Sequence, residues 1–219
     1  MSRETSLITY YAQRAQVYER VYEKPERREQ LDSLKDLVRV TFDGRTVMEV
    51  ACGTGYWTAV AAETAVHVTA FDVNESVLAL ARAKGLDSRR VEFLLGDAYE
   101  PPAFGKRFDA ALVAFWWSHM PRKRVRGFLG RLHAALRPTA IVLCLDNTFV
   151  PGDSTPITRT DEDGNTFQMR RLEDGREFEV LKNYPTEENL REAITPVADV
   201  AEVKWLRHYW MLRYRLRAR

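Results

Sequence analysis

Short apolar runs alternate with helix-forming stretches through the middle of the chain. Runs rich in β-branched and aromatic residues are expected to form strands at 46–51, 66–71, 90–95, 108–115 and 140–145. Helical composition fills the intervals 56–64, 75–84 and 121–136. Strands that alternate with helices predict a parallel sheet with right-handed crossovers, so we expect an α/β fold.

The last part of the chain predicts a different pairing. A short helix over 187–194 is followed by two strand-like runs, 197–205 and 209–216, with almost no connection between them. Two strands joined so closely pair antiparallel, because a parallel pair needs a long crossover. We therefore expect an antiparallel last pair at one edge of the sheet.

Two further stretches lie outside the alternation. Residues 1–40 predict two helices that break at Pro25, because proline interrupts a helix interior. Residues 148–185 are rich in turn formers and predict a β-hairpin with strands at 167–172 and 177–181. Neither stretch belongs to the alternating core.

The composition is that of an average globular domain. The chain has 219 residues, of which 45% are hydrophobic and 29% charged, and this length fits one domain. It has neither the roughly 20-residue apolar run of a membrane helix nor an apolar signal segment, so we expect a cytoplasmic protein without membrane attachment. A net charge of +2 gives no field to attract nucleic acid. Cys52 and Cys144 lie in apolar runs, which predicts buried thiols.

A glycine-containing turn follows the first predicted strand. Gly53 and Gly55 stand just before a helix, where glycine lets the backbone approach a ligand closely. Asp72 ends the next strand, where a carboxylate can accept hydrogen bonds from the hydroxyls of a ribose. The turn therefore predicts a cofactor that contains a nucleoside.

Three residues favour S-adenosylmethionine over a dinucleotide. Thr58 stands where the dinucleotide fingerprint has its third glycine. Glu49, just before the turn, would repel a diphosphate but suits a cofactor with an ammonium group and a sulfonium. Asp97, after the third strand, offers hydrogen-bond partners for an adenine amine. A nicotinamide oxidoreductase is an alternative that competition with NAD would reveal.

Taken together, the segments 49–55 and 96–98 and the carboxylate Asp72 resemble motifs of the class I S-adenosylmethionine-dependent methyltransferases. The resemblance covers about residues 40–146. It implies a Rossmann-like three-layer sandwich with a mostly parallel seven-stranded sheet and an antiparallel last strand pair. Ala51 stands where the family usually has glycine, and we expect a negative φ there.

The resemblance also implies where the cofactor is held. Asp72 would bind the ribose, Asp97 the adenine edge, and the carbonyl of Phe115 would lie near the ammonium group. An N-terminal helix would bring aromatic hydroxyls and a guanidinium to the methionine carboxylate, unless it merely packs on the sheet edge. The expected cofactor-binding residues are Tyr11, Arg14, Tyr18, Glu49, Ala51, Gly53, Gly55, Asp72, Val73, Asp97, Ala98 and Phe115.

Candidates for contact with the methyl acceptor follow the fourth and fifth strands. His119 is a candidate catalytic base, or alternatively a residue that packs over the cofactor. One of Trp116 and Trp117 is expected in the core and the other against the acceptor. Asp146 or Asn147 is expected to orient the acceptor, and no metal is expected because the acidic ligand of metal-dependent relatives is missing.

We expect a single methyltransferase domain over residues 1–219. Within it, residues 1–40 would form an N-terminal helical lid and residues 148–185 an inserted hairpin that covers the acceptor. The candidate residues of this cover are Asn165, Phe167, Arg170, Arg171, Asn183 and Tyr184.

The sequence thus predicts methyl transfer from S-adenosylmethionine to an oxygen or nitrogen of a small-molecule acceptor, by a monomer or homodimer. An RNA or protein methyltransferase is the first alternative and would need an open basic groove. The basic clusters at 122–126 and 207–217 are better explained as solvated faces. A non-catalytic protein that binds the cofactor without transferring its methyl group is the second alternative.

Overall fold

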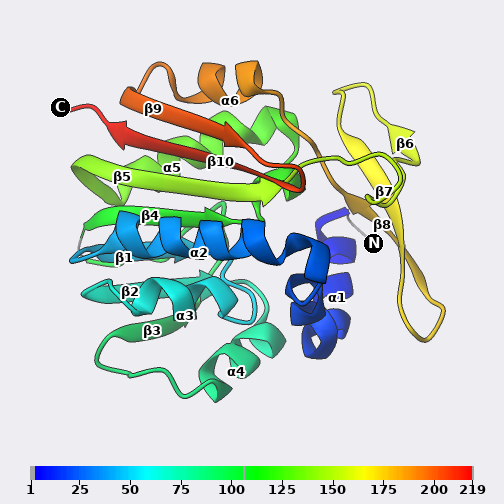
Figure 1. Ribbon diagram of the computed structural model, residues 1–219, viewed down its shortest axis with the longest axis horizontal. Helices are drawn as coiled ribbons and strands as arrows, with labels where there is room; N and C mark the ends of the chain where they lie inside the picture. The colour runs from blue at the N-terminus through cyan, green and yellow to red at the C-terminus, as the bar shows by residue number, and fades with distance from the viewer. Residues whose placement is uncertain (1–2, 106, 219) are drawn as a thin grey trace.

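A seven-stranded sheet forms the centre of the protein (Figure 1). The computed structural model describes residues 3–105 and 107–218, and the side chains of residues 3–7 lie outside that description. In spatial order the strands are β3 (Val91–Leu95), β2 (His67–Asp72), β1 (Thr46–Val50), β4 (Phe108–Ala114), β5 (Leu136–Asn147), β10 (Tyr209–Leu216) and β9 (Ala198–Trp205). Strand β10 is antiparallel to both neighbours, whereas the other pairs are parallel. This confirms the predicted α/β fold and its antiparallel last pair.

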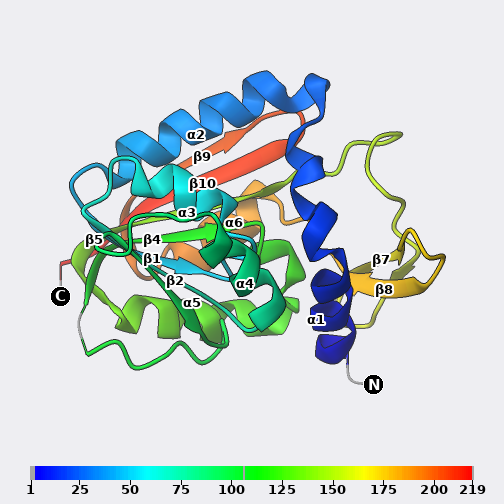
Figure 2. The ribbon, with the colours of Figure 1, turned by 90° about the horizontal axis from the view of Figure 1, so that it is seen from below.

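Helices cover both faces of the sheet and complete three layers (Figures 1 and 2). One face carries α2 (Arg28–Phe42), α3 (Tyr56–Ala62) and α4 (Glu75–Ala83), and the other carries α5 (Val125–Ala134) and α6 (Glu187–Ile194). Each face has its own core, one around Phe42 and Trp57 and the other around Phe128 and Trp210. Strand β4, buried throughout except for Asp109, contributes to both cores.

The helix predicted over 121–136 is shorter than expected. It starts with a 3₁₀ turn, η4 (Arg122–Arg124), and α5 ends at Ala134. Strand β5 begins at Leu136 and therefore contains Pro138. The pairing of β4 with β5 shifts register at this point, and residues 137–139 are exposed. A proline is tolerated where it removes no hydrogen bond between strands.

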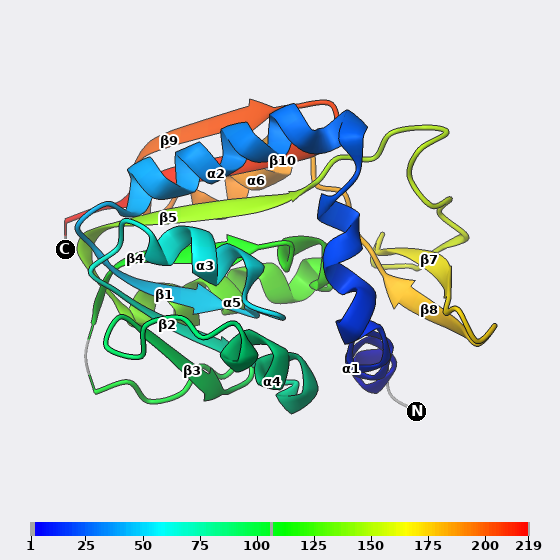
Figure 3. The same cartoon turned by 60° about the horizontal axis from the view of Figure 1, so that its bottom comes forward.

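The two stretches outside the alternation meet at the carboxyl ends of the parallel strands (Figure 3). Residues 1–2 of the predicted lid lie outside the described residues. The N-terminal stretch forms α1 (Arg3–Arg14) and the 3₁₀ helices η1 (Ala15–Tyr22) and η2 (Pro25–Arg27). The insertion forms a small sheet of β6 (Arg159–Thr160), β7 (Thr166–Arg171) and β8 (Glu177–Leu181), and β8 packs against α1.

Two further findings bear on the sequence expectations. Cys52 and Cys144 are both buried free thiols, as predicted. Among the helices of the described residues, none is both long and apolar enough to cross a bilayer.

The negative φ expected at Ala51 is wrong. This residue has a φ of 53°, in the left-handed region. The amide of Cys52 still donates to the carbonyl of Phe71, at 3.1 Å, so the chain pairs with β2 two residues beyond the end of β1. The turn towards α3 is therefore made abruptly at Ala51. This conformation costs an L-residue about 1–2 kcal/mol, and a glycine at this position would avoid that strain.

We expect the substitution Ala51→Gly to raise the free energy of unfolding by up to about 1 kcal/mol. Relief of about 1–2 kcal/mol of strain exceeds the unfolded-state entropy of about 0.4–1 kcal/mol that glycine adds. Urea unfolding measures the change. Ala59→Gly, inside α3, serves as the control and is expected to destabilise by about 1 kcal/mol. Equal destabilisation by both substitutions would contradict the strain at Ala51.

Candidate functional site

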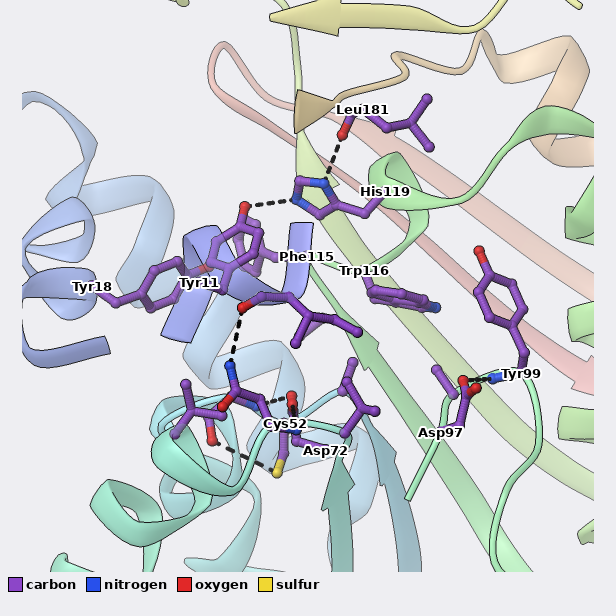
Figure 4. A pocket seen from close by; sticks show the side chains of 18 of the residues that line it. Tyr11, Tyr18, Cys52, Asp72, Asp97, Tyr99, Phe115, Trp116, His119 and Leu181 are labelled. Atoms are coloured by element: carbon purple, nitrogen blue, oxygen red, sulfur yellow. Dashed lines mark hydrogen bonds between the residues drawn. The ribbon is translucent and has the colours of Figure 1, made fainter. Parts of the chain in front are cut away.

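A cavity lies at the carboxyl ends of β1, β2 and β4, beneath α1 (Figure 4). All the residues expected to bind the cofactor, except Arg14 and Gly55, line it. They come from five separate parts of the chain: the end of β1 with the turn after it, the end of β2, the segment after β3, the end of β4, and the N-terminal helices. The fold thus brings together most of the predicted cofactor-binding set.

The turn after β1 is held by the carboxylate of Asp72. Its Oδ2 accepts a hydrogen bond from the amide of Gly53 at 3.0 Å, and its Oδ1 accepts one from the amide of Asn74 at 2.9 Å. Burial raises the pKa of Asp72, although these amides oppose the rise. Gly53 has a φ of 55°, and a Cβ built there would meet nothing within 4 Å. Space for a ligand therefore lies directly beside this backbone.

Gly55 has a different role from the one expected. A Cβ at this position would lie 3.0 Å from the Cβ of Ala81 and 3.2 Å from the ring of Phe93. Its φ of 75° also lies in the left-handed region. Gly55 is therefore needed where the turn packs on α4 and β3, and it does not line the cavity.

Glu49 presents an unpaired carboxylate oxygen. The residue is 1% exposed, and its Oε2 has no hydrogen-bond partner among the described residues. Burial raises the pKa of Glu49 to about 8. The neighbouring hydroxyl of Thr58 opposes this rise without forming a hydrogen bond of normal geometry, and the charge of Asp72 adds to it. A cation bound in the cavity would stabilise the ionised form of Glu49.

The two tryptophans after β4 point to different places. Trp116 lines the cavity, and its buried Nε1 has no partner among the described residues. Trp117 is 4% exposed and packs edge-on against Trp210 in the core, with ring centres 6.0 Å apart. Of the two acceptor-binding candidates, Trp117 is therefore the core residue.

His119 connects three segments of the chain (Figure 4). Its Nδ1 lies 2.8 Å from the carbonyl oxygen of Leu181, which can only accept, so Nδ1 carries the proton. Its Nε2 then accepts from the hydroxyl of Tyr11 at 2.9 Å. Burial, with the positive charge of Lys182, lowers the pKa of His119 to about 3. The imidazole is therefore neutral at physiological pH.

A second cavity adjoins the first on the hairpin side. The two share Tyr11, Tyr18, Phe115 and His119 as common walls, together with Tyr22. Three residues predicted for cofactor or acceptor binding line only this second cavity: Arg14, Asn147 and Tyr184. Arg14 thus lines only the second cavity, which it shares with Tyr11, Tyr18 and Phe115 among the expected cofactor residues.

Lys182 also lines the second cavity, and the sequence analysis did not identify it. Its Nζ lies 3.0 Å from Oδ1 of Asp146, and their side chains are 6% and 0% exposed. The same Nζ donates to Oγ of Ser118 at 2.6 Å and to Oδ1 of Asn147 at 3.1 Å. Burial is the largest single influence and would raise the pKa of Asp146, but the charge of Lys182, together with His119 and the amides of Ser118 and Asn147, lowers that pKa overall. No local pattern marks a lysine that directly follows a strand as the partner of a distant aspartate.

The other residues predicted for the cover are divided between several places. Asn165 and Phe167 line the first cavity, and Arg170 lines the second. Asn183 is buried and donates from Nδ2 to the carbonyl of Met120 at 2.8 Å, whereas Arg171 is exposed. Among the described side chains, no three His, Cys, Asp or Glu residues gather as a metal site.

Comparison with known proteins places the chain among methyltransferases. A family model described as a methyltransferase domain matches residues 47–139. The demethylmenaquinone methyltransferase of Clavibacter sepedonicus is 30% identical over 168 residues, which make up 75% of this chain and 64% of that protein. The chain thus spans less than two thirds of the length of the curated relatives it matches.

Solved structures resemble the protein over nearly its full length. A DhpI–SAH complex matches with a TM-score of 0.80 at 27% identity, and the match covers 98% of this chain and 97% of that chain. A DhpI–SAM–HEP complex matches with a TM-score of 0.80 at 28% identity and covers 97% of each chain. The likeness includes α1 and the inserted hairpin, because almost no part of the chain is left unmatched.

The raised pKa of Glu49 predicts a pH dependence of stability. With a pKa of about 8 when folded against 4.5 as the ordinary value, the folded protein binds more protons than the unfolded chain between these values. The free energy of unfolding of the ligand-free protein therefore falls as pH rises through this window. Glu49→Gln should flatten the fall, and urea unfolding at pH 5, 6.5 and 8 measures it. Glu63→Gln, an exposed carboxylate, is the control; identical slopes for Glu49→Gln and the parent protein would disprove the shift.

Proposed function

Because this chain belongs to the class I S-adenosylmethionine-dependent methyltransferases, an enzyme family whose cofactor is S-adenosylmethionine, we propose that it methylates an oxygen or nitrogen atom of a small-molecule acceptor. The observation that carries this proposal is the meeting of two cavities at His119 and Tyr11. One cavity has the predicted cofactor residues, and the other has room for a second molecule beside it.

The chemistry of the first cavity fits the cofactor. The buried, unpaired Oε2 of Glu49 suits a positively charged group, and the open space at Gly53 accommodates an aliphatic chain beside the backbone. Asp72 would bind the ribose hydroxyls with the lone pairs that Gly53 and Asn74 leave open. Asp97 and Ala98 would contact the adenine edge, and Tyr11 and Tyr18 would close the cavity from α1 and η1.

When bound, S-adenosylmethionine supplies a methyl carbon activated by a sulfonium. The residues of this chain then need to hold the acceptor in line, exclude water and take up a proton where the acceptor carries one. Orientation of this kind can supply about 7–11 kcal/mol of the barrier reduction. The rings of Tyr11, Phe115 and Trp116 wall this region and exclude water from it.

His119 is proposed as the group that receives the acceptor's proton. Its unprotonated nitrogen is Nε2, which faces the hydroxyl of Tyr11 at 2.9 Å. A proton that leaves the acceptor can pass through this hydroxyl to Nε2. The hydrogen bond from Nδ1 to the Leu181 carbonyl fixes the ring in the required tautomer.

The two segments at the cavity mouth are proposed to act as covers. Of the predicted N-terminal lid, α1 and η1 would close over the cofactor, whereas α2 packs on the sheet. Residues 148–185 would close over the acceptor, which Trp116, Asn147 and Tyr184 would contact. These covers enclose a space suited to a small molecule. An RNA acceptor would require an open groove, so the proposal is limited to small molecules.

The direct test is release of S-adenosylhomocysteine in a screen of small acceptors, with mass spectrometry of the products to locate the methyl group. We expect transfer to an oxygen or nitrogen of at least one acceptor class. Tight cofactor binding without transfer to any acceptor would instead identify a non-catalytic binding protein.

Asp72→Asn is expected to weaken binding of S-adenosylhomocysteine by more than tenfold. The amide keeps the size of the side chain but lacks one of the two oxygens that serve both the turn and the ribose. Calorimetry measures the affinity, and thermal unfolding of the ligand-free variant separates this loss from general destabilisation. Asp87→Asn, a carboxylate exposed after α4, is the matched control. An unchanged affinity of the Asp72 variant would disprove its role at the ribose.

His119→Asn and His119→Gln separate proton uptake from positioning. The first can keep a donor near the Leu181 carbonyl and the second an acceptor for Tyr11, but neither can take up a proton. We expect kcat to fall by at least about 100-fold in both, with cofactor affinity kept within threefold. Since the pKa of His119 is about 3, kcat/KM should show no histidine inflection near pH 6.5. Full turnover by either variant would remove His119 as the proton acceptor.

A further inference from the structure

Positive charge is concentrated in the second cavity. Five basic side chains line it, those of Arg14, Lys24, Arg27, Arg170 and Lys182, against a single lining carboxylate, Asp153. That carboxylate is already engaged: its Oδ2 lies 2.9 Å from Nη2 of Arg27 and 3.0 Å from Nε2 of His208, and its Oδ1 lies 3.8 Å from Nζ of Lys24. Lys182 is paired with the buried Asp146, and Asp153 is paired with Arg27 and Lys24, so the cations left without a carboxylate partner are Arg14 and Arg170.

Neutral groups hold both of these guanidinium groups. Arg14 donates from Nη1 to the hydroxyl of Tyr10 at 2.9 Å. Arg170 donates from Nη1 to Oγ1 of Thr155 at 2.7 Å and from Nη2 to Oε1 of Gln168 at 2.6 Å. Among the described residues, no carboxylate lies within ion-pair distance of either guanidinium.

The charges converge from three separate elements on the junction of the two cavities. Arg14 comes from α1, Arg170 from β7, and Lys182 directly follows β8. Arg14 and Arg170 both oppose the rise in the pKa of Tyr11, and Arg170 and Lys182 both help to lower the pKa of His119. These charges therefore act on both partners of the hydrogen bond between Tyr11 and His119.

Such an arrangement is unfavourable without a ligand. Like charges in a partly enclosed cavity repel one another, and the sheltered surroundings weaken their screening by water. An arginine held by neutral acceptors presents its remaining N–H groups in a planar fork that matches the two oxygens of a carboxylate or phosphate. Groups placed in this way are typical of an anion site.

We propose that the second cavity binds an anionic oxygen group, a carboxylate or a phosphate, carried by the methyl acceptor, with Arg14 and Arg170 as its direct ligands and Lys182 at its base. This inference rests on the proposed function, because it identifies the class of molecule that the same site would methylate. It goes beyond a generic small molecule, since a neutral acceptor would leave both guanidinium groups without a counter-charge.

An anion in this position would also affect His119. Its negative charge would offset those of Lys182 and Arg170, and the pKa of His119 would rise from its low value. A bound acceptor would thereby make the imidazole a stronger proton acceptor. The pKa of His119 would therefore be higher, and proton uptake more favourable, with an acid bound in the cavity than with the cavity empty.

Binding of small anions tests the proposal without any methyl transfer. The probes are acetate, inorganic phosphate and acetamide, which is the neutral counterpart of acetate, titrated by calorimetry into protein saturated with S-adenosylhomocysteine. We expect acetate or phosphate to bind at least tenfold more tightly than acetamide. The tighter of the two anions then distinguishes a carboxylate site from a phosphate site.

Variants locate the binding to this cavity. Arg14→Gln and Arg170→Gln should each weaken anion binding by at least tenfold, and Arg170→Lys, which keeps the charge, should weaken it less. Arg176→Gln, an exposed arginine beside Asp174 at the hairpin tip, is the matched control and should bind as the parent does. Thermal unfolding and affinity for S-adenosylhomocysteine identify any variant that has lost its fold.

Equal affinity for acetate and acetamide, or full anion affinity in both glutamine variants, would overturn the proposal. A turnover screen with acids and their matched amides separates this failure from failure of the proposed function. Faster methylation of the acids, lost in Arg170→Gln, supports the anion site. Equal methylation of acids and amides would refute the anion site but would still support the proposed methyltransferase activity. Anion binding without methylation of any compound would refute only the proposed methyltransferase activity.

Discussion

The buried ion pair between Lys182 and Asp146 is the interaction on which the functional end of the protein depends. Its atoms lie 3.0 Å apart, with almost no exposure of either side chain. Two charges removed from water are tolerated only when they pair and their remaining hydrogen-bonding groups are satisfied, and here Ser118 and Asn147 complete the pair. The requirement fixes the end of β8 against the end of β5.

A continuous set of hydrogen bonds surrounds that pair. The carbonyl of Leu181 accepts from His119, the amide of Asn183 donates to the carbonyl of Ser118, and the side chain of Asn183 donates to Met120. The end of the hairpin is thus matched residue by residue with the 3₁₀ turn η3 (Trp117–His119) and the residue after it. Helix α1 packs on β8 in turn, which brings Tyr11 to His119. One buried charge pair therefore positions both covering segments.

The sheet and the covers contribute different parts of the site. The strand ends supply much of the lining of the first cavity, and two of them turn abruptly, at Ala51 and Phe115, with φ values of 53° and 59°. Strained backbone of this kind is typical of positions where a ligand approaches closely. The N-terminal stretch and the hairpin insertion supply the cations of the second cavity. In the part of the chain that the structure describes, the two cavities share only four aromatic side chains and His119.

The sequence by itself determined the features that depend on neighbouring residues. Alternating strand and helix signals predicted the sheet, and the turn around Gly53 with Asp72 predicted the cavity, because short-range patterns specify elements and parallel strands end at one edge. Only the tertiary structure decided the φ of Ala51, the core position of Trp117 and the place of Arg14. It also paired Lys182 with Asp146, 36 positions away. Each of these depends on which distant segments pack together, and no local pattern encodes that packing.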